Sequence, residues 1–289
     1  KIRELRECGH EGTARAYASS LRSMQRYLGK KDFPFIKLSS RIISDYQGKL
    51  LASGICDNTI GFYLHNIKAL FRKGCREMGL ELPCPFRDIS IKTEKTLKRS
   101  LDPVVIKTLS AIELEKDSPL SLARDIFMFS FYTRGMSFVD IALLKKRHVF
   151  PGEICYRRHK TDQLMRVGIN KEISRILERY KNVPGEYIFP LFPAERDPYA
   201  GYRSAYHRIR YSLGKISRVI GLEFPLRLHA ARHSWATIAK VNGASVHVIG
   251  ECLGHTSEKT TRIYLKELDH SALDAVNNQV ADFILAVDD

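Results

Sequence analysis

Apolar side chains recur at helical spacing through the first 90 residues. Between residues 12 and 29 they follow steps of four, three and four, which is typical of one buried helix face. These positions are Tyr17, Leu21, Met24 and Leu28. A second stripe spans residues 42–50 after a Ser39-Ser40 capping signal, and a third follows Asn58, which we expect to cap its helix. The pattern predicts a helical bundle over residues 1–90.

The rest of the chain mixes helical and strand patterns. Residues 91–100 are polar, basic and aperiodic, so we interpret them as a linker between two domains. Helix-start signals follow at Asp102-Pro103 and Ser118-Pro119. Residues 152–169 alternate apolar and polar side chains, as a β-hairpin does. Helical patterns return at residues 171–180 and 202–219.

The second domain, residues 101–289, is therefore predicted to be mixed α+β. Its last segment, Ala272 to Ile284, has the pattern of an amphipathic tail helix. The apolar face of this segment comprises Leu273, Val276, Val280, Phe283 and Ile284. The predicted fold class is mainly α with a small antiparallel β-sheet, arranged in two domains.

Charge narrows the choice of partner. The formal net charge is +15, and residues 1–100 carry 20 Lys and Arg against 10 Asp and Glu. A strongly basic chain favours a polyanionic partner, nucleic acid first and an anionic membrane surface second. A solvated surface would not explain the uneven distribution. The predicted contacts to the DNA backbone are Arg15, Arg22, Arg26, Lys68, Arg72, Lys73, Lys95, Lys98 and Arg99.

Several classes of protein are disfavoured. No apolar run is long enough to span a bilayer, and no signal peptide heads the chain. The six Cys residues have no metal-binding spacing and are typical of free thiols in a reducing cytoplasm, so we expect a cytoplasmic protein. The chain begins with Lys rather than Met, which suggests that further residues precede it.

The stretch from His229 to Tyr264 carries candidate chemistry. His229 and Arg232 are three residues apart, so on a helix they share one face and can converge on one anion. His255 and Tyr264 are nine residues apart, and a phenol beside cationic and imidazole groups can serve as a nucleophile. Each feature alone is more often structural than functional.

Together, the order and spacing of these residues resemble the catalytic core of the tyrosine recombinases, the lambda-integrase type of site-specific DNA recombinase. The match consists of His229-x-x-Arg232, then Leu253-Gly254-His255, then Tyr264. The resemblance implies an N-terminal helical core-binding domain and a C-terminal catalytic domain. It also implies an enzyme that cuts and rejoins double-stranded DNA through a 3′-phosphotyrosine.

The resemblance also assigns roles to residues. Tyr264 would attack the phosphate, and Arg232 and His255 would stabilise charge on its oxygens. His229 would take the phenol proton, and Lys160, in a Lys-Thr pattern at the hairpin turn, would protonate the leaving 5′-oxygen. This chemistry implies no metal ion and no cofactor. No acidic cluster of ligand spacing supports a metal-dependent nuclease.

The family pattern also implies partners. We expect a bacterial mobile-element integrase that acts at the nucleoid and self-associates on DNA, as a tetrameric synapse held by the C-terminal tail. Accessory DNA-bending or directionality proteins are further expected partners.

One motif departs from the family pattern. Most tyrosine recombinases carry a first catalytic Arg in a motif close to Thr-Gly-Leu-Arg-x-x-Glu-Leu. If Asp140 takes the acidic position here, the Arg position falls on Ser137, and Arg134 lies three residues earlier. Three residues make about one helical turn, so we predict that Arg134 serves the phosphate and that Asp140 is structural. A similar substitution occurs in a branch on Bacteroides-type mobile elements.

Two alternatives stay open at this point. A type IB topoisomerase uses similar groups, although the tail helix and the two-domain size argue against it. A catalytically inactive DNA-binding protein of the same fold is suggested by Ser137. Covalent capture of DNA would exclude the inactive protein, and a Holliday-junction intermediate would exclude the topoisomerase.

Overall fold

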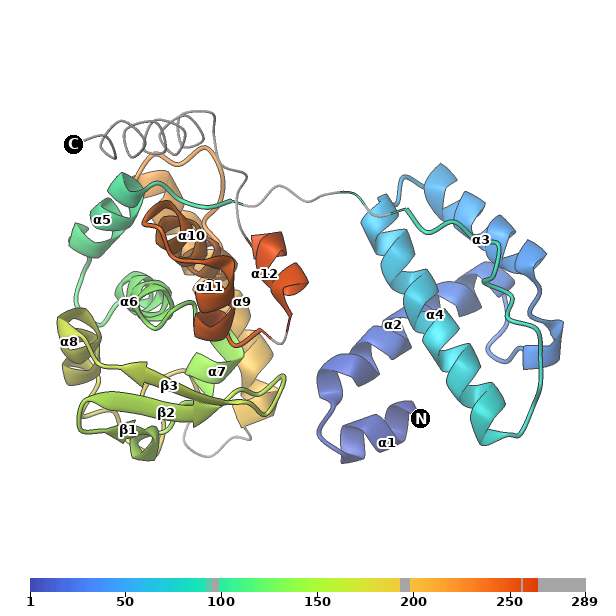
Figure 1. Cartoon of the computed structure of the whole chain (residues 1–289), viewed down its shortest axis with the longest axis horizontal. Coiled ribbons are helices and arrows are strands. Elements are labelled where there is room, and N and C mark those ends of the chain that lie inside the picture. Colours follow the sequence, from blue (N-terminus) through green and yellow to red (C-terminus); the bar gives the residue numbers. More distant parts are fainter. Residues whose placement is uncertain (93, 95–98, 193–197, 256, 265–289) are drawn as a thin grey trace, which may run out of the picture. The chain divides into compact units, whose positions relative to one another are not determined.

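The computed structural model divides into two compact units, Lys1–Thr96 and Leu97–Asp289 (Figure 1). We call them the N-terminal and C-terminal units. The structure describes all residues except 93, 95–98, 193–197, 256 and 265–289, and it describes only the backbone of 198–200, 263 and 264. The predicted tail helix at residues 272–284 lies outside the described residues.

The N-terminal unit is a bundle of helices. These are α1 (Ile2–Glu7), α2 (Glu11–Leu28), the 3₁₀ helix η1 (Phe35–Lys37), α3 (Ser40–Ala52) and α4 (Asp57–Glu77). Residues from all three predicted apolar stripes meet in one core, which includes Met24, Ile43, Tyr46, Ile60, Leu64 and Phe71. Leu21, predicted on the buried face of the first stripe, is instead 38% exposed. Within this core the Tyr46 hydroxyl donates a hydrogen bond to the Ser23 hydroxyl over 2.8 Å, so its polar end is satisfied where it is buried.

One predicted helix cap is correct and one is wrong. Ser39 caps α3 and accepts a hydrogen bond from the backbone N–H of Ile42. Asn58 lies inside α4, which begins one residue earlier with Cys56 as its N-cap. The Asn58 amide instead exchanges two hydrogen bonds of 3.1 Å with the backbone of Glu94. It therefore ties the end of the N-terminal unit to α4, a contact that local spacing cannot reveal.

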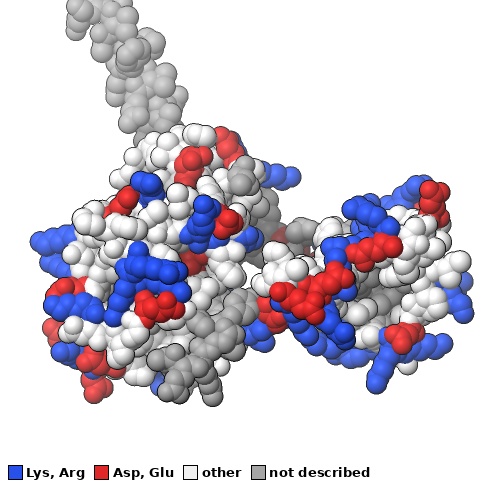
Figure 2. Space-filling model, turned by 90° about the horizontal axis from the view of Figure 1, so that it is seen from below, with Lys and Arg blue, Asp and Glu red and all other residues white. Residues whose placement is uncertain are grey.

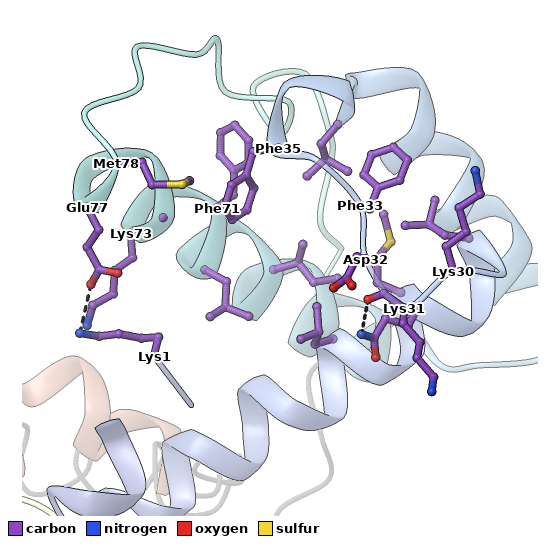
Figure 3. A pocket seen from close by; sticks show the side chains of 18 residues that line it. Lys1, Lys30, Lys31, Asp32, Phe33, Phe35, Phe71, Lys73, Glu77 and Met78 are labelled. Atoms are coloured by element: carbon purple, nitrogen blue, oxygen red, sulfur yellow. Dashed lines mark hydrogen bonds and ion pairs between the residues drawn. The ribbon is translucent and has the colours of Figure 1, made fainter. Parts of the chain in front are cut away.

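An apolar pocket of about 410 Å³ lies between α2, α4 and the segment before α3 (Figure 3). Phe35 and Phe71 meet edge to face in its wall, with ring centroids 5.7 Å apart. Gly74 makes this possible, because a Cβ atom there would lie 2.7 Å from the Phe35 ring. The aromatic contact anchors the segment between α2 and α3 on α4.

The C-terminal unit is built around one buried helix, α6 (Pro119–Tyr132). Its other helices are α5 (Pro103–Ala111), α7 (Phe138–Ala142), η2 (Lys146–His148), α8 (Lys171–Arg179), α9 (Pro198–Val219), α10 (Leu228–Val241), α11 (Val246–Leu253) and α12 (Glu258–Tyr264). Helices α5, α7, α8, α9 and α10 all contact α6, whose sequence is apolar around most of its circumference (Figure 1). Asp102 and Ser118 cap α5 and α6 as predicted.

A three-stranded antiparallel sheet forms one edge of the C-terminal unit. Strands β1 (Val149–Phe150), β2 (Glu153–Arg157) and β3 (Leu164–Gly168) lie in sequence order, and the register pairs Tyr156 with Met165. Ile154, Tyr156, Met165 and Val167 are buried and alternate with exposed or half-buried residues, which fixes the register because a one-residue slip would expose them. The predicted hairpin is confirmed, and so is the predicted fold class.

No helix in the described ranges is long and apolar enough to cross a membrane.

Candidate active site

Arg232 is the buried centre of the candidate site. It projects from α10 and is only 5% exposed. Its Nη1 atom donates a hydrogen bond to the Gly135 carbonyl over 2.7 Å, and its Nη2 atom donates one to the Leu253 carbonyl over 2.5 Å. The guanidinium group therefore joins α10 to the turn after α6 and to the end of α11. These contacts fix its position before any substrate binds.

Gly135 is the residue that allows Arg232 to pass. Its φ is +76°, a left-handed conformation that favours glycine. A Cβ atom at this position would lie 2.6 Å from Cγ of Arg232. Gly135 thus has a packing role that is independent of the charge of the preceding Arg134.

His255 lies directly against Arg232. Its Nε2 atom is 2.9 Å from Nη2 of Arg232, and its Nδ1 atom is 3.1 Å from the Thr261 hydroxyl. A guanidinium group can only donate, so Nε2 accepts and the proton of the neutral ring sits on Nδ1. Burial, followed by the charges of Arg232, Arg158 and Lys160, lowers the pKa of His255 to about 4. At neutral pH His255 is therefore an uncharged hydrogen-bonding group.

Asp140 holds the β2–β3 hairpin in place. It is buried on α7, and one carboxylate oxygen accepts a 2.5 Å hydrogen bond from the hydroxyl of Ser137, the N-cap of that helix. The other oxygen accepts a 2.8 Å hydrogen bond from the backbone N–H of His159. His159 immediately precedes Lys160, which is exposed in the turn. Lys160 contributes to the lowered pKa of His255, so the two side chains share one electrostatic environment.

Arg158, on the same hairpin, was not singled out from the sequence. It is half-buried, and its Nη1 atom donates a hydrogen bond to the Gly254 carbonyl. Gly254 adopts a left-handed conformation, with φ of +63°, and a Cβ atom there would lie 2.9 Å from the Met165 sulfur and 3.0 Å from Cδ of Arg158. The hairpin is therefore packed against the Leu-Gly-His segment. Its partner lies 96 residues away, so no local sequence signal could have identified this contact.

Arg134 does not lie on a helix, which corrects the helical-turn argument made for it from the sequence. It follows the end of α6 with φ of +60°, and α7 begins only at Phe138. Its Nη1 atom lies 3.5 Å from the carbonyl of Arg166 on β3, at the limit of a hydrogen bond. Position 134 therefore does not share a helix face with Ser137.

His229 lies on the first turn of α10 and is exposed. Its ring meets the ring of His233 edge to face, with centroids 4.8 Å apart. With Arg232, Ser137, Tyr202 and Tyr206 it lines a pocket of about 240 Å³. This pocket gives an approach from solvent to the buried Arg232.

Tyr264 is the last residue of α12, and the structure describes only its backbone. Helix α12 packs on α10 and α11 (Figure 1). Thr261, fully buried on α12, contacts His255. Position 264 is three residues further along the same helix, which places the two positions on one helix face.

A second phenol lies near these charges. Tyr156 on β2 is buried, and this burial, followed by the negative charge of Asp140, raises the pKa of its hydroxyl. Arg158, Arg232 and Arg134 act in the opposite direction but do not outweigh it. Tyr156 therefore stays protonated and is unsuited to act as a nucleophile at neutral pH.

The predicted DNA-contacting residues of the N-terminal unit lie on α2 and α4. On α2, Arg22 and Arg26 are exposed, whereas Nε of Arg15 donates to the Glu11 carboxylate over 2.6 Å. On α4, Arg72 is exposed. Lys68 and Lys73, also on α4, are partly buried. Figure 2 shows acidic side chains interspersed with the basic ones on the face in view, so charge does not single out a DNA-binding surface on this face.

The linker residues are placed only in part. Lys95 and Lys98 lie outside the described residues. Arg99 is exposed, with its guanidinium carbon 4.8 Å from the centroid of the Phe224 ring. This cation–π contact anchors the start of the C-terminal unit on the loop before α10.

A basic concave surface lies on α9, where the sequence pattern predicted a helix at residues 202–219. It encloses about 640 Å³ and includes His207, Arg210, Lys215, Arg218 and Arg227. Tyr211, 68% exposed, lies among them, and the Lys215 ammonium is 4.8 Å from its ring centroid. An exposed aromatic ring within a cluster of cations is typical of nucleic-acid contact surfaces.

Within the described ranges, no group of three or more His, Cys, Asp or Glu side chains is arranged to hold a metal ion.

Comparison with known proteins agrees with this geometry. Residues 100–270 match the phage integrase family, and residues 1–86 match the phage integrase SAM-like domain. The tyrosine recombinase XerC of Shewanella oneidensis is 26% identical over 226 residues, covering 75% of this chain and 70% of the relative. The tyrosine recombinase XerD of Pseudomonas putida is 24% identical and covers 88% of this chain and 86% of the relative.

Solved structures share the fold. A lambda integrase structure superposes with a TM-score of 0.66 and 17% identity, covering 90% of this chain and 91% of the integrase chain. A Tn1549 transposon integrase structure superposes with a TM-score of 0.65 and 16% identity, covering 92% of this chain and 99% of the integrase chain. The chain belongs to the phage integrase family, the tyrosine-type site-specific recombinases. The predicted family and the predicted enzyme class, a site-specific recombinase, are confirmed.

Proposed function

We propose that this recombinase cleaves duplex DNA by direct attack of Tyr264 on a phosphodiester. The phenol oxygen forms a bond to phosphorus as the bond to the 5′-oxygen breaks, which leaves a 3′-phosphotyrosine and a free 5′-hydroxyl. The energy of the phosphodiester is conserved in the covalent bond, so a 5′-hydroxyl from another strand can reverse the step. No metal ion or high-energy cofactor takes part.

The charge and the protons of this reaction are assigned to residues of the site. Arg232 stabilises the non-bridging oxygens, and His255 supports it as a neutral hydrogen-bonding group. Lys160, at the hairpin turn, gives a proton to the leaving 5′-oxygen, and the exposed His229 takes the phenol proton. Arg134 is the second arginine suggested by the sequence.

One observation supports this proposal most strongly. Arg232 is buried yet faces a solvent-connected pocket, and its Nη2 atom is 2.9 Å from His255. His255 is in turn bonded to Thr261, on the short helix that ends at Tyr264. A guanidinium group, a neutral imidazole and the nucleophile's helix are thus tied together without a substrate. Preorganised donors of this kind are the largest contributors to stabilising a developing oxyanion.

The test is covalent capture. The protein is incubated in EDTA with a pool of nicked duplexes of random central sequence, and denaturant-resistant protein–DNA adducts are isolated, amplified and sequenced. We expect wild-type adducts with one duplex sequence, and none with Tyr264→Phe. Specific binding of a duplex without any adduct would contradict the catalytic proposal and favour the inactive DNA-binding protein.

We further propose double-stranded DNA as the substrate and self-association on it. The lambda integrase structures that share this fold include a dimer bound to a core site and a tetramer bound to a Holliday junction. The basic surface on α9 and the net charge of +15 support a DNA partner. Deleting residues 272–289, which include the predicted tail helix at residues 272–284, should leave binding to a single site intact and abolish synapsis, as measured by mass photometry on the captured duplex.

Three finer assignments stay predictions. They are the integrative role on a mobile element of the Bacteroides type, the action at the nucleoid, and the accessory proteins. Recombination assays between two captured sites, with and without host extract, would test the role and the need for accessory proteins. A four-way junction among the products would exclude a topoisomerase that acts by strand rotation.

A further inference from the structure

The site holds one well-buried guanidinium group where related enzymes use two. The family's first arginine position corresponds to Ser137, whose hydroxyl is bonded to Asp140 and caps α7. Ser137 supplies no positive charge. If two arginines are to share the charge of the transition state, the second must therefore come from another segment of the chain.

Arg134, the replacement suggested by the sequence, is poorly placed for this role. Its Nη1 atom reaches toward the Arg166 carbonyl, on the strand β3, at 3.5 Å. Arg134 is absent from the charges that act on His255. The turn that carries Arg134 also has a structural role, because its Gly135 accommodates the Arg232 side chain.

Arg158 enters the site from the hairpin. Its Nη1 atom donates to the Gly254 carbonyl, while Arg232 donates to the adjacent Leu253 carbonyl. The two guanidinium groups therefore bind consecutive carbonyls at the end of α11, immediately before His255. Both also act on the His255 ring, where Arg158 is the second strongest of the charges that disfavour its protonation.

The positive charges in this arrangement repel one another unless an anion binds among them. Two guanidinium groups and Lys160 bear on one imidazole, and the nearby carboxylate of Asp140 is already bonded to Ser137 and to the His159 backbone. A bound phosphate would offset the repulsion among the cations. Arginine has five N–H donors, and the contact with Gly254 uses one of them.

We propose that Arg158 supplies the second guanidinium group for the scissile phosphate, at a position that the sequence alone gave to Arg134. The proposal rests on the proposed cleavage by Tyr264. Arg158 neutralises charge on a non-bridging oxygen together with Arg232. Because it stands two residues before Lys160, the hairpin delivers the cation and the proton donor to the phosphate as one element.

The test compares a charged and a neutral phosphate. Single-turnover adduct formation is measured on the captured duplex with a normal scissile phosphate and with a methylphosphonate, in which one charged oxygen is replaced by a methyl group. An arginine that neutralises this charge matters on the phosphate and much less on the methylphosphonate. A residue that only supports the fold matters equally on both.

The variants are Arg158→Ala, Arg158→Lys, Arg134→Ala and Arg232→Ala, with Arg157→Ala as the matched control. Arg157 is the exposed neighbour on β2, paired with Asp162, and its change should alter neither rate by more than about threefold. We expect Arg158→Ala to lower cleavage of the phosphate by about 10²-fold or more, and that of the methylphosphonate by less than about tenfold. Arg232→Ala should show the same selectivity.

Equal losses on both substrates, or no loss, would overturn the assignment of Arg158. In that case a selective loss with Arg134→Ala would return the role to Arg134. If Arg158→Ala does not fold, Arg158→Lys takes its place, and the ratio of its loss on the phosphate to its loss on the methylphosphonate decides. Lysine keeps a charge but not the planar fork of arginine. A wild-type protein that forms no adduct on either duplex would overturn the proposed function itself, and the assignment of Arg158 with it.

Discussion

Nη2 of Arg232 lies 2.9 Å from Nε2 of His255. The same guanidinium group also donates hydrogen bonds to the carbonyls of Gly135 and Leu253. One side chain thus joins the turn after α6, the helix α10 and the end of α11. The residue proposed to stabilise the transition state is also a structural link between segments far apart in the sequence. Stability and catalysis should therefore be lost together when it is changed.

Arg232→Ala should lower the stability of the C-terminal unit and also abolish its activity. The change leaves two carbonyls without their donor, at a cost of about 1–3 kcal/mol each where they are buried. The single tryptophan, Trp235, lies one turn further along α10 and reports on this unit. Its fluorescence in a urea titration should show a lower midpoint. A midpoint equal to that of the wild type would contradict the structural link.

Gly135→Ala should damage the site by steric conflict alone. A non-glycine residue at positive φ costs about 1–3 kcal/mol, and overpacking against Arg232 adds about 1–3 kcal/mol. Gly152→Ala is the matched control, because Gly152 has φ of +82° but no atom within 4 Å of the added Cβ. We expect Gly135→Ala to lower both the urea midpoint and the cleavage rate, and Gly152→Ala to lower the midpoint less. Equal losses would mean that backbone strain is the whole effect.

The sequence predicted much of this site because its motifs are local. His229 and Arg232 share one helix, and Leu253-Gly254-His255 forms the end of another. The periodicity located the helices and the hairpin for the same reason. Arg158 was missed because its partner Gly254 is 96 residues away.

The helical-turn argument for Arg134 was wrong for a related reason. Counting three residues as one helical turn assumes a continuous helix, and the left-handed conformations of Arg134 and Gly135 interrupt it. That interruption is explained by the close approach of Arg232, a tertiary contact. Sequence spacing identified the candidate residues, whereas long-range packing decides which of them reach the site.

His255 should titrate far below an ordinary histidine. Burial, then Arg232, Arg158 and Lys160, lower its pKa to about 4, whereas an unfolded histidine has a pKa of about 6.5. NMR of ¹⁵N-labelled imidazoles should show a neutral ring with its proton on Nδ1 from pH 7 down to about 5. A ring that titrates near 6.5 would contradict the arrangement.

The same shift makes stability depend on pH. Between about pH 6.5 and 4 the unfolded chain binds a proton at His255 that the folded chain does not. The contribution of His255 to stability is therefore fully present above about pH 6.5 and is lost as the pH falls toward 4. His255→Gln should reduce the difference between the urea midpoints at pH 7.5 and pH 5. An unchanged difference would assign the pH dependence to other groups.

Lys160→Ala should be rescued by a better leaving group. Loss of a general acid typically costs about 10²–10⁴-fold in rate. A duplex with sulfur in place of the bridging 5′-oxygen releases a thiolate, whose conjugate acid has a pKa of about 8.5, so it needs no proton donor. Cleavage of this duplex by Lys160→Ala should approach the wild-type rate, while Tyr264→Phe should stay inactive on it. A deficit that persists on the sulfur duplex would assign Lys160 to binding instead.

The basic surface on α9 should contribute to affinity through counterion release. Arg210 and Arg218 both line it, eight residues apart on one helix. If each contacts one phosphate, the double variant Arg210→Ala/Arg218→Ala should bind more weakly and should reduce the slope of log K against log salt by about 2. Fluorescence anisotropy with the captured duplex, measured at several salt concentrations, gives this slope.

The control for this surface is a pair of arginines elsewhere on the C-terminal unit. Arg175 and Arg179 are exposed on α8 and form ion pairs with Glu172 and Asp125 respectively. Because these partners already neutralise them, their replacement by alanine should leave the salt slope unchanged. If both double variants change the slope equally, the effect follows net charge and α9 is no contact surface. If only the α9 variant changes it, the duplex lies against the basic surface on α9.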